Sequence, residues 1–414
     1  MTPIDPIYIG DDAVNELLRY CETHALENLV LIADDNTYAA LGEEVDAALR
    51  QQSDAVTTII LKGDEIIADA HYVTQVLVQA PVQKQTYIAV GTGTITDITR
   101  FVSHRTRNSF ISVPTAPSVD GFTSVGAPLV LNGVKITIKS QAPRAVFVDL
   151  PTLQAAPGNL IAAGFGDILG KMTSLADWQL GHLLWHEPFD ESIAKRTRKA
   201  LDLCISNSEG IGGRDAEAIH TLIDGLLESG LCILDFGASH PASGAEHHCS
   251  HYWEMLLLRE GRPSVLHGAK VGVGARLIAD LYARIGAMDL DEAQARIMQA
   301  TLPDRYAEIA TIRDAYGDGA DDVIAGQSPF LDMSETEFAA LKQRVIDHWD
   351  DIRAIAAQVM PDKELGRLLN VVGGPSSGDA LGFSEAEIQA GFRYGHYLRN
   401  RFTVRKLAHL FGLT

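Results

Sequence analysis

Three histidines crowd into five residues in the stretch SGAEHHCSHYWE. His247 and His251 are four residues apart, so a helix over this stretch places both on one face, whereas His248 points elsewhere. Another imidazole, His267, stands beside a glycine in the later stretch LHGAKVGVG. Neutral imidazole is a common ligand of transition metals, so the pattern indicates a metal site, with isolated polar residues of a core as the alternative.

An acidic residue supplies a third candidate ligand. Asp167 lies between small residues in AAGFGDILGK, at a predicted helix interior. One carboxylate and two imidazoles leave coordination positions open, which is typical of a catalytic metal. The donor set suits Zn, which we expect first, and also Ni or Fe(II). The spacing leaves open whether His251 is a ligand or a neighbour of one.

A glycine turn follows an apolar run in IAVGTGTITDITRFV. Gly91 and Gly93 let the backbone approach a phosphate, and the free amides of a helix starting near Thr94 favour an anion. The stretch lacks the third glycine of the usual dinucleotide fingerprint. A plain tight turn between a strand and a helix is therefore the alternative.

Two further polar stretches follow predicted strands. LIADDNTYAALG contains Asp34, whose carboxylate is suited to accept hydrogen bonds from a ribose or to cap a helix. SVPTAPSVDGFTSVG collects small hydroxyl residues where a sheet would hold them rigidly, although a structural turn also favours such residues. Its candidates for ligand contact are Thr115, Ser118, Asp120 and Ser124.

The scaffold that must position these residues changes character along the chain. Over residues 1–155, runs rich in Val and Ile alternate with helical patterns; the runs are NLVLIADD, VTTIIL, TYIAVGTG, SFISVPTA and AVFVDL. They predict a mainly parallel sheet covered on both faces, as in a dinucleotide-binding α/β domain. Within this domain, Asn132-Gly133 between alternating apolar residues predicts a hairpin turn.

Residues 156–414 are predicted to form an all-α domain. Ser334 with Glu337, and Ser384 with Glu387, have the spacing of capping boxes that open two helices. The first box precedes an amphipathic period of three to four residues in MSETEFAALKQRVIDHWDDIRAIAAQVM. The apolar helical half also favours a homo-oligomer, for which a dimer is our expectation.

Charge and cysteine usage restrict the partners. Lys and Arg total 34 against 54 Asp and Glu, and the net charge of -20 would repel nucleic acid and anionic membranes. The four cysteines are dispersed without a CxxC pair, and no apolar run reaches the ~20 residues of a membrane span. We therefore expect a cytoplasmic protein whose partner is a small molecule.

Five of these stretches, in their order and spacing, resemble the sn-glycerol-1-phosphate dehydrogenase family of the iron-containing alcohol dehydrogenase and dehydroquinate synthase superfamily. They are GTGTITD, SVPTAPSVDGFTS, GFGDILGKMTSLADW, SGAEHHCSH and LHGAKVGVG. The resemblance is close over about residues 25–280. It implies a dehydroquinate synthase-like fold and hydride transfer between NAD(P)H and the C2 carbonyl of dihydroxyacetone phosphate. The product, sn-glycerol 1-phosphate, is a metabolite of phospholipid metabolism.

The resemblance also implies roles for individual residues. Asp167, His247 and His267 would hold one divalent metal ion. Asp120, Asp167 and His251 would contact the substrate, a phosphorylated three-carbon compound, and take part in catalysis. The residues expected to contact the dinucleotide, with Asp34 added from the argument above, are Gly93, Thr94, Ile95, Thr96, Asp97, Thr115, Ala116, Pro117, Ser118 and Ser124.

Three other functions stay open at this point. A glycerol or polyol dehydrogenase of the same superfamily would lack a phosphate site, for which Lys135, Lys139 and Lys171 are candidates. A sugar-phosphate cyclase is a lyase that uses NAD transiently, and the resemblance counts against it because such enzymes tend to have Glu in place of Asp167. A non-enzymatic dinucleotide-binding scaffold would bind no metal.

Overall fold

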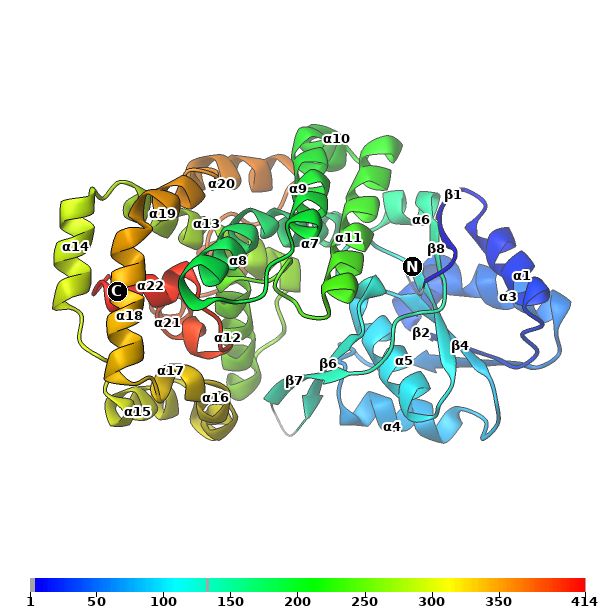
Figure 1. The fold of residues 1–414 in the computed structure, drawn as a ribbon. Helices are drawn as coiled ribbons and strands as arrows, with labels where there is room; N and C mark the ends of the chain where they lie inside the picture. Colours follow the sequence, from blue (N-terminus) through cyan, green and yellow to red (C-terminus); the bar gives the residue numbers. More distant parts are fainter. Residues whose placement is uncertain (1–3, 132–133, 414) are drawn as a thin grey trace. The chain divides into compact units, whose positions relative to one another are not determined.

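The computed structural model describes residues 4–131 and 134–413, which form two compact units (Figure 1). The first unit contains the residues up to 168 and residues 202–237, and the second contains 169–201 and the residues from 238 onward. The predicted single boundary near residue 155 differs from this division. Residues 202–237 join the first unit because Oγ1 of Thr123 donates to the carbonyl of Leu227 at 3.0 Å, in the long helix α11 (Ala216–Phe236).

A six-stranded parallel sheet forms the centre of the first unit, in the order β1-β8-β5-β4-β2-β3. Its strands are β1 (Ile7–Gly10), β2 (Leu29–Asp34), β3 (Val56–Leu61), β4 (Thr86–Gly91), β5 (Ser109–Pro114) and β8 (Val146–Asp149). The five predicted strands are confirmed. The sequence analysis did not predict β1, because four residues at a half-buried edge carry too short a pattern.

Helices cover both faces of this sheet, as Figure 1 shows. Leu29, Leu31 and Ala33 of β2 pack with α1 (Ala13–Thr23) and α3 (Glu43–Gln52). The intervening Val30 and Ile32 pack on the opposite face, where α4 (Ala70–Gln79) and α5 (Gly93–Arg105) lie. A strand buried on both faces needs apolar side chains at every position, which explains the continuous Val and Ile runs.

A two-stranded antiparallel ribbon lies beside the sheet, as predicted. It pairs β6 (Gly126–Leu131) with β7 (Val134–Lys139), while the turn expected at Asn132-Gly133 lies outside the described residues. The other short elements of the first unit are α2 (Asp35–Thr37), η1 (Tyr38–Gly42), η2 (Gly121–Thr123), α6 (Leu150–Ala155) and α10 (Ser208–Gly213). Helices α7 (Gly158–Leu169) and α9 (Glu191–Ser206) run across the division between the units.

The described part of the second unit is built from helices alone, around a large apolar core that includes Trp253, Trp349 and Phe402. Its elements are α8 (Lys171–Trp185), α12 (Ala245–Glu260), α13 (His267–Gly286), α14 (Leu290–Gln299), α15 (Arg305–Tyr316), η3 (Gly317–Gly319), α16 (Ala320–Gly326), α17 (Ser328–Leu331), α18 (Glu335–Asp347), α19 (Trp349–Ala356), α20 (Asp362–Val371), η4 (Asp379–Leu381), α21 (Glu385–Tyr394), η5 (Gly395–Tyr397) and α22 (Val404–Leu410). The predicted fold class is confirmed.

Both predicted capping boxes are present at the starts of α18 and α21. The amphipathic stretch behind the first box is two helices, because the backbone at His348 leaves the helical region with φ −109° and ψ 23°. Residues on both sides keep the apolar face, so periodicity alone does not reveal the break. Across the described ranges, every helix is too short or too polar to cross a membrane.

Candidate active site

The predicted phosphate turn connects β4 directly to α5. Gly91 ends the strand and Gly93 begins the helix, with Thr92 between them in an extended conformation. Thr92 makes no side-chain capping hydrogen bond, so the first amides of α5 keep their donors for other acceptors. Such a helix start at the carboxyl end of a parallel strand is suited to a pyrophosphate.

The second predicted dinucleotide stretch lies against this turn. The amide of Thr115 donates to the carbonyl of Gly91 at 3.2 Å, and a Cβ added at Gly93 would approach Cγ2 of Val119 to 3.0 Å. Residues 93–97 and 115–124 therefore meet at the carboxyl ends of β4 and β5. In this region Ile95 and Thr96 are buried in the sheet core, so these two residues can offer a ligand only their backbone.

Arg100 forms hydrogen bonds with both dinucleotide stretches, residues 93–97 and 115–124. Its guanidinium is fully buried and donates to Oδ1 of Asp97 at 2.7 Å and to the carbonyls of Gly121 at 2.6 Å and Phe122 at 3.1 Å. Burial raises the pKa of Asp97 to about 7, opposed by the charges of Arg100 and Lys135. Arg100 was not predicted as a site residue, because in the sequence it has only the features of an ordinary helix residue. Its role becomes visible only from its contacts in the folded structure.

Asp120 and Asp167 are brought together although 47 residues separate them. The amide of Asp120 donates to Oδ2 of Asp167 at 3.0 Å, and Oγ of Ser229 donates to Oδ2 of Asp120 at 2.9 Å. Asp167 is fully buried in α7, as predicted for a helix interior. A Cβ added at Gly164 would lie 1.7 Å from the carbonyl oxygen of Pro117, so only glycine lets α7 approach the loop this closely.

Asp34 caps a helix start. Its Oδ1 accepts the amide of Thr37 at 2.8 Å, and the hydroxyl of Thr37 accepts the amide of Asp34 at 2.9 Å. Of the two roles predicted for Asp34, helix capping is therefore observed, through one oxygen of its carboxylate. A ribose contact through this residue stays a prediction.

The histidines meet within the second unit. His247 and His251 lie on one helix, as predicted; this helix, α12, begins at Ala245, and His267 is the first residue of α13. The ring centroid of His267 is 5.2 Å from that of His247 and 5.4 Å from that of His251. His248 is also buried, and it belongs to neither of the two groups of possible metal ligands found among the described residues. The three converging imidazoles have the donor chemistry of a transition-metal site.

A buried carboxylate orients the first of these rings. Oε1 of Glu246 lies 2.8 Å from Nδ1 of His247 and accepts the amide of Gly244 at 2.7 Å, while Oε2 accepts the hydroxyl of Thr173 at 2.7 Å. Burial would raise the pKa of Glu246, yet the hydrogen bonds with His247 and its other donors hold it below the usual value. Nδ1 of His247 is therefore engaged, and Nε2 is the atom suited to a metal.

A second carboxylate, that of Glu254, lies close to His251 and His267. His251, Glu254 and His267 each offer a ligand atom, and these atoms lie within 4.8 Å of one another. Nζ of the buried Lys270 is 3.7 Å from Oε1 of Glu254. The sequence analysis missed Glu254, although its position three residues after His251 places it on the same helix face. Imidazole nitrogens and carboxylate oxygens together fit Zn, Ni or Fe(II).

Asp177 anchors the start of α12. Its Oδ2 accepts the amide of Ala245, while its Oδ1 accepts the amide of Val404 and the hydroxyl of Tyr282, each at 2.7 Å. Burial, followed by the nearby charge of Glu246, raises the pKa of Asp177 to about 7. Asp177 lies within the family stretch GFGDILGKMTSLADW, yet its role is not predictable from the sequence because its partners come from distant segments.

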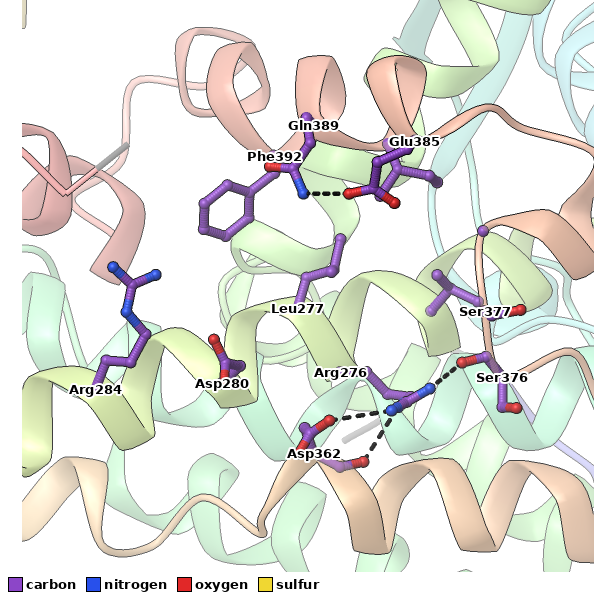
Figure 2. Close-up of a pocket in the computed structure, with 13 residues that line it drawn as sticks. Arg276, Leu277, Asp280, Arg284, Asp362, Ser376, Ser377, Glu385, Gln389 and Phe392 are labelled. Carbon is purple, nitrogen blue, oxygen red and sulfur yellow. Dashed lines mark hydrogen bonds and ion pairs between the residues drawn. The ribbon is translucent and has the colours of Figure 1, made fainter.

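A separate cavity of about 350 Å³ opens in the second unit between α13, α20 and α21. Arg276 lines this cavity and donates to Oδ2 of Asp362 at 3.0 Å and to the carbonyl of Ser376. Figure 2 marks both interactions with dashed lines. None of the predicted site residues lines this cavity. The histidine cluster is therefore the candidate active site of the unit.

Comparison with solved structures defines the fold. The sulfoacetaldehyde reductase of Bifidobacterium kashiwanohense, in complex with NAD+, has a TM-score of 0.61 at 15% identity and covers 100% of this chain and 97% of that chain. An iron-containing alcohol dehydrogenase from Corynebacterium glutamicum has a TM-score of 0.60 at 12% identity, covering 100% and 95%. Residues 8–157 also match the sequence model for iron-containing alcohol dehydrogenase. The fold is that of the iron-containing alcohol dehydrogenases.

Comparison with curated sequences narrows the class to a family. A glycerol-1-phosphate dehydrogenase [NAD(P)+] from Geobacillus thermodenitrificans is 38% identical over 405 residues, 97% of this chain and 91% of the relative. The protein of that name from Halalkalibacterium halodurans is 46% identical over 282 residues, 67% of this chain and 71% of the relative. That of Bacillus subtilis is 36% identical over 404 residues, 97% and 90%. The chain belongs to the glycerol-1-phosphate dehydrogenase family, and the predicted resemblance is confirmed.

Proposed function

We propose that this protein is a metal-dependent NAD(P)H oxidoreductase that interconverts dihydroxyacetone phosphate and sn-glycerol 1-phosphate. The names of the relatives, glycerol-1-phosphate dehydrogenase [NAD(P)+], support the substrate and the cofactor. The observation that carries the proposal is the convergence of His247, His251 and His267 on two neighbouring helices. A scaffold that only bound a dinucleotide would have no need to gather three imidazoles beside two carboxylates.

The first unit supplies the cofactor site in this proposal. The uncapped amides of α5 bind the pyrophosphate, and residues 93–97 and 115–118 with Ser124 surround the rest of the dinucleotide. When bound, the nicotinamide supplies or accepts the hydride. Arg100 keeps both stretches in one arrangement, so that cofactor and substrate loops do not move independently.

The metal ligands in this proposal are Asp167, His247 and His267, with Zn as the first expectation and Ni or Fe as alternatives. The observed contact between Glu246 and His247 supports it, because metal-binding histidines generally donate their other ring N–H to a carboxylate or carbonyl. A metal ion in such a site supplies Lewis acidity toward a carbonyl oxygen. The protein's own task is to hold His247 and His267 in a fixed orientation.

Asp120 and His251 handle the substrate. Asp120 is held by Ser229 and by its amide contact with Asp167, so its carboxylate is oriented before the substrate arrives. His251 holds a proton on its ring and exchanges it with the substrate hydroxyl, while Glu254, 3.5 Å from Nδ1, steadies the ring. We further propose a location in the cytoplasm, which the dispersed cysteines support, and a homodimer, which the apolar helical half of the chain supports.

NADH oxidation by metal-reconstituted protein tests the proposal. Dihydroxyacetone phosphate and dihydroxyacetone are compared as substrates, each with a chelator control. We expect chelator-sensitive turnover of the phosphate ester and, by chiral analysis, sn-glycerol 1-phosphate as product. Turnover of the unphosphorylated ketone alone would identify a polyol dehydrogenase instead, and an absence of net NADH consumption would favour a cyclase.

A further inference from the structure

His267 is shared by two sets of residues that have the donor chemistry of a metal site. One is the proposed ligand set, in which His267 acts with Asp167 and His247. The other lies wholly within the second unit, where His251, Glu254 and His267 each offer a ligand atom and these atoms lie within 4.8 Å of one another. Both sets contain one carboxylate and two imidazoles, as catalytic metal ions often do. Ligand type alone therefore does not decide where an ion binds.

The second set lies between two helices, together with a lysine. His251 and Glu254 are three residues apart on α12, and His267 and Lys270 are three residues apart on α13, so each pair shares one face of its helix. The rings of His251 and His267 are stacked, with centroids 5.4 Å apart and planes inclined by 28°. Nζ of Lys270 lies 3.7 Å from Oε1 of Glu254. Each helix thus contributes one histidine and one charged residue.

Close packing holds Lys270 in this position. A Cβ added at Gly274 would lie 2.7 Å from the carbonyl oxygen of Glu246, so only glycine lets α13 approach α12 this closely. The Lys270 side chain is fully buried, whereas 16% of the Glu254 side chain is exposed. The ammonium group of Lys270 is therefore held against the carboxylate of Glu254.

The two oxygens of Glu254 have different neighbours. Oε1 faces Lys270, and Oε2 lies 3.5 Å from Nδ1 of His251. An ion bound to Oε1 would lie within roughly 6 Å of the ammonium, because a metal–oxygen bond is about 2 Å long. Repulsion between a divalent cation and a buried ammonium is only weakly screened. Lys270 thus makes the second set unfavourable for a metal ion, although its donor atoms are suitable.

We propose that Lys270 is a positioning residue that keeps the carboxylate of Glu254 out of metal coordination. The ion is then confined to the His247 side of His267, and His251 stays available to the substrate instead of becoming a ligand. The inference rests on the proposed function and names the residue that separates the substrate histidine from the metal histidines. A neutral side chain at position 270 would leave the Glu254 carboxylate without a counter-charge, which a metal ion would then supply.

A double-mutant cycle of Lys270→Met and His251→Gln tests the inference, with Co²⁺ as the probe in a chelator competition assay. In the wild-type background, His251→Gln should change the Kd of Co²⁺ by less than about threefold, since it removes neither a ligand nor an outer carboxylate. In the Lys270→Met background, the same substitution should weaken binding by at least about tenfold, because a direct ligand contributes no less than an outer carboxylate. Glu254→Gln should have the same effect in that background.

The spectrum of bound Co²⁺ gives a readout that a merely structural role of Lys270 would not change. We expect the visible bands to shift in Lys270→Met and to return toward those of the wild-type protein when Glu254→Gln is added. Lys270→Arg keeps the charge and should retain the wild-type spectrum. Lys363→Met, which replaces an exposed lysine of α20, is the matched control.

Two results would overturn the inference. A loss of Co²⁺ affinity of about tenfold or more in His251→Gln alone would make His251 a ligand of the wild-type protein. Equally small effects of His251→Gln in both backgrounds would show that Lys270 does not exclude Glu254 from the metal. Lys270→Gln, which keeps a polar end in the buried position, replaces Lys270→Met if that variant does not fold. The measurements use neither NADH nor dihydroxyacetone phosphate, so failure of the wild-type protein to reduce this ketone would refute the proposed function separately.

Discussion

Oε1 of Glu246 lies 2.8 Å from Nδ1 of His247, the residue that follows it in the chain. Neighbours along a helix ordinarily point in different directions, so this contact depends on the helix start. Glu246 lies in the first turn of α12 and reaches back to the amide of Gly244, which brings its carboxylate within reach of the His247 ring. The pair fixes the ring orientation and leaves Nε2 for a ligand.

Replacement of Glu246 by Gln should weaken metal binding without removing a ligand. An outer carboxylate typically contributes about 10- to 100-fold to metal affinity, and we expect a loss of that size in a chelator competition assay. Glu260→Gln, at the exposed end of the same helix, is the matched control. Unchanged metal affinity in Glu246→Gln would show that the carboxylate only caps the helix start.

His267→Ala should abolish turnover and reduce bound metal while NADH affinity stays close to that of the wild-type protein. The reason is that His267 belongs to the histidine cluster of the second unit, whereas the predicted dinucleotide residues belong to the first. Metal content and fluorescence titration with NADH provide the two measurements. His220→Ala, on the exposed face of α11, is the control. A joint loss of NADH affinity would mean that His267 supports the fold.

Arg100→Met should loosen the cofactor and substrate loops together. The substitution leaves the Asp97 carboxylate buried without its cation, so the free energy of unfolding should fall by about 3 kcal/mol, and the Kd of NADH should rise. The double variant Arg100→Met, Asp97→Asn should recover part of the stability, because no charge is then left unpaired. Arg105→Met at the exposed end of the same helix is the control. Equal destabilisation in the single and double variants would contradict this coupling.

Asp97 should make cofactor binding depend on pH. Its raised pKa of about 7 means that the folded protein takes up a proton here as the pH falls through that value, and the ionised form prevails above it. Only the ionised carboxylate accepts hydrogen bonds through both oxygens, so the Kd of NADH should increase roughly tenfold from pH 8 to pH 6. Asp97→Asn should give a flat profile, and the exposed-site variant Asp64→Asn should behave like the wild-type protein.

Gly164→Ala should disturb the substrate loop through packing alone. The added methyl group would lie 1.7 Å from the carbonyl oxygen of Pro117, so α7 or the loop must move. We expect a loss of about 1–3 kcal/mol in the free energy of unfolding, by chemical denaturation, and a higher substrate KM. Gly213→Ala ends α10 with no atom within 4 Å of the new Cβ and serves as the control. Equal stability of the two variants would show that the loop yields easily.

Local signals in the sequence predicted five of the six strands of the sheet and the starts of two helices. Apolar runs predicted β2, β3, β4, β5 and β8, because a strand buried on both faces shows its environment in its own residues. Ser334 and Glu337 marked the start of a helix for the same reason, since a capping box is complete within four residues. The spacing of His247 and His251 likewise predicted a shared helix face.

Contacts between segments that are distant in the chain could not be predicted from the sequence. Nothing near Arg100 indicates that its guanidinium reaches the carbonyls of Gly121 and Phe122, and nothing near Asp177 indicates that it joins Ala245 to Val404. The assignment of residues 202–237 to the first unit also depends on such contacts. Tertiary packing determines these partners, and short sequence patterns do not predict it.

By itself, the sequence determined the alternation of strands and helices in the first unit, the helical character of the second, the family, and the residue types capable of binding a metal and a dinucleotide. Only the tertiary structure decided that His267 joins the α12 histidines, that Glu246 occupies Nδ1 of His247, and that Asp120 meets Asp167. The physical reason is that periodicity and capping are properties of neighbouring residues. Desolvation and hydrogen-bond partnership depend on which remote segments the folded chain brings into contact.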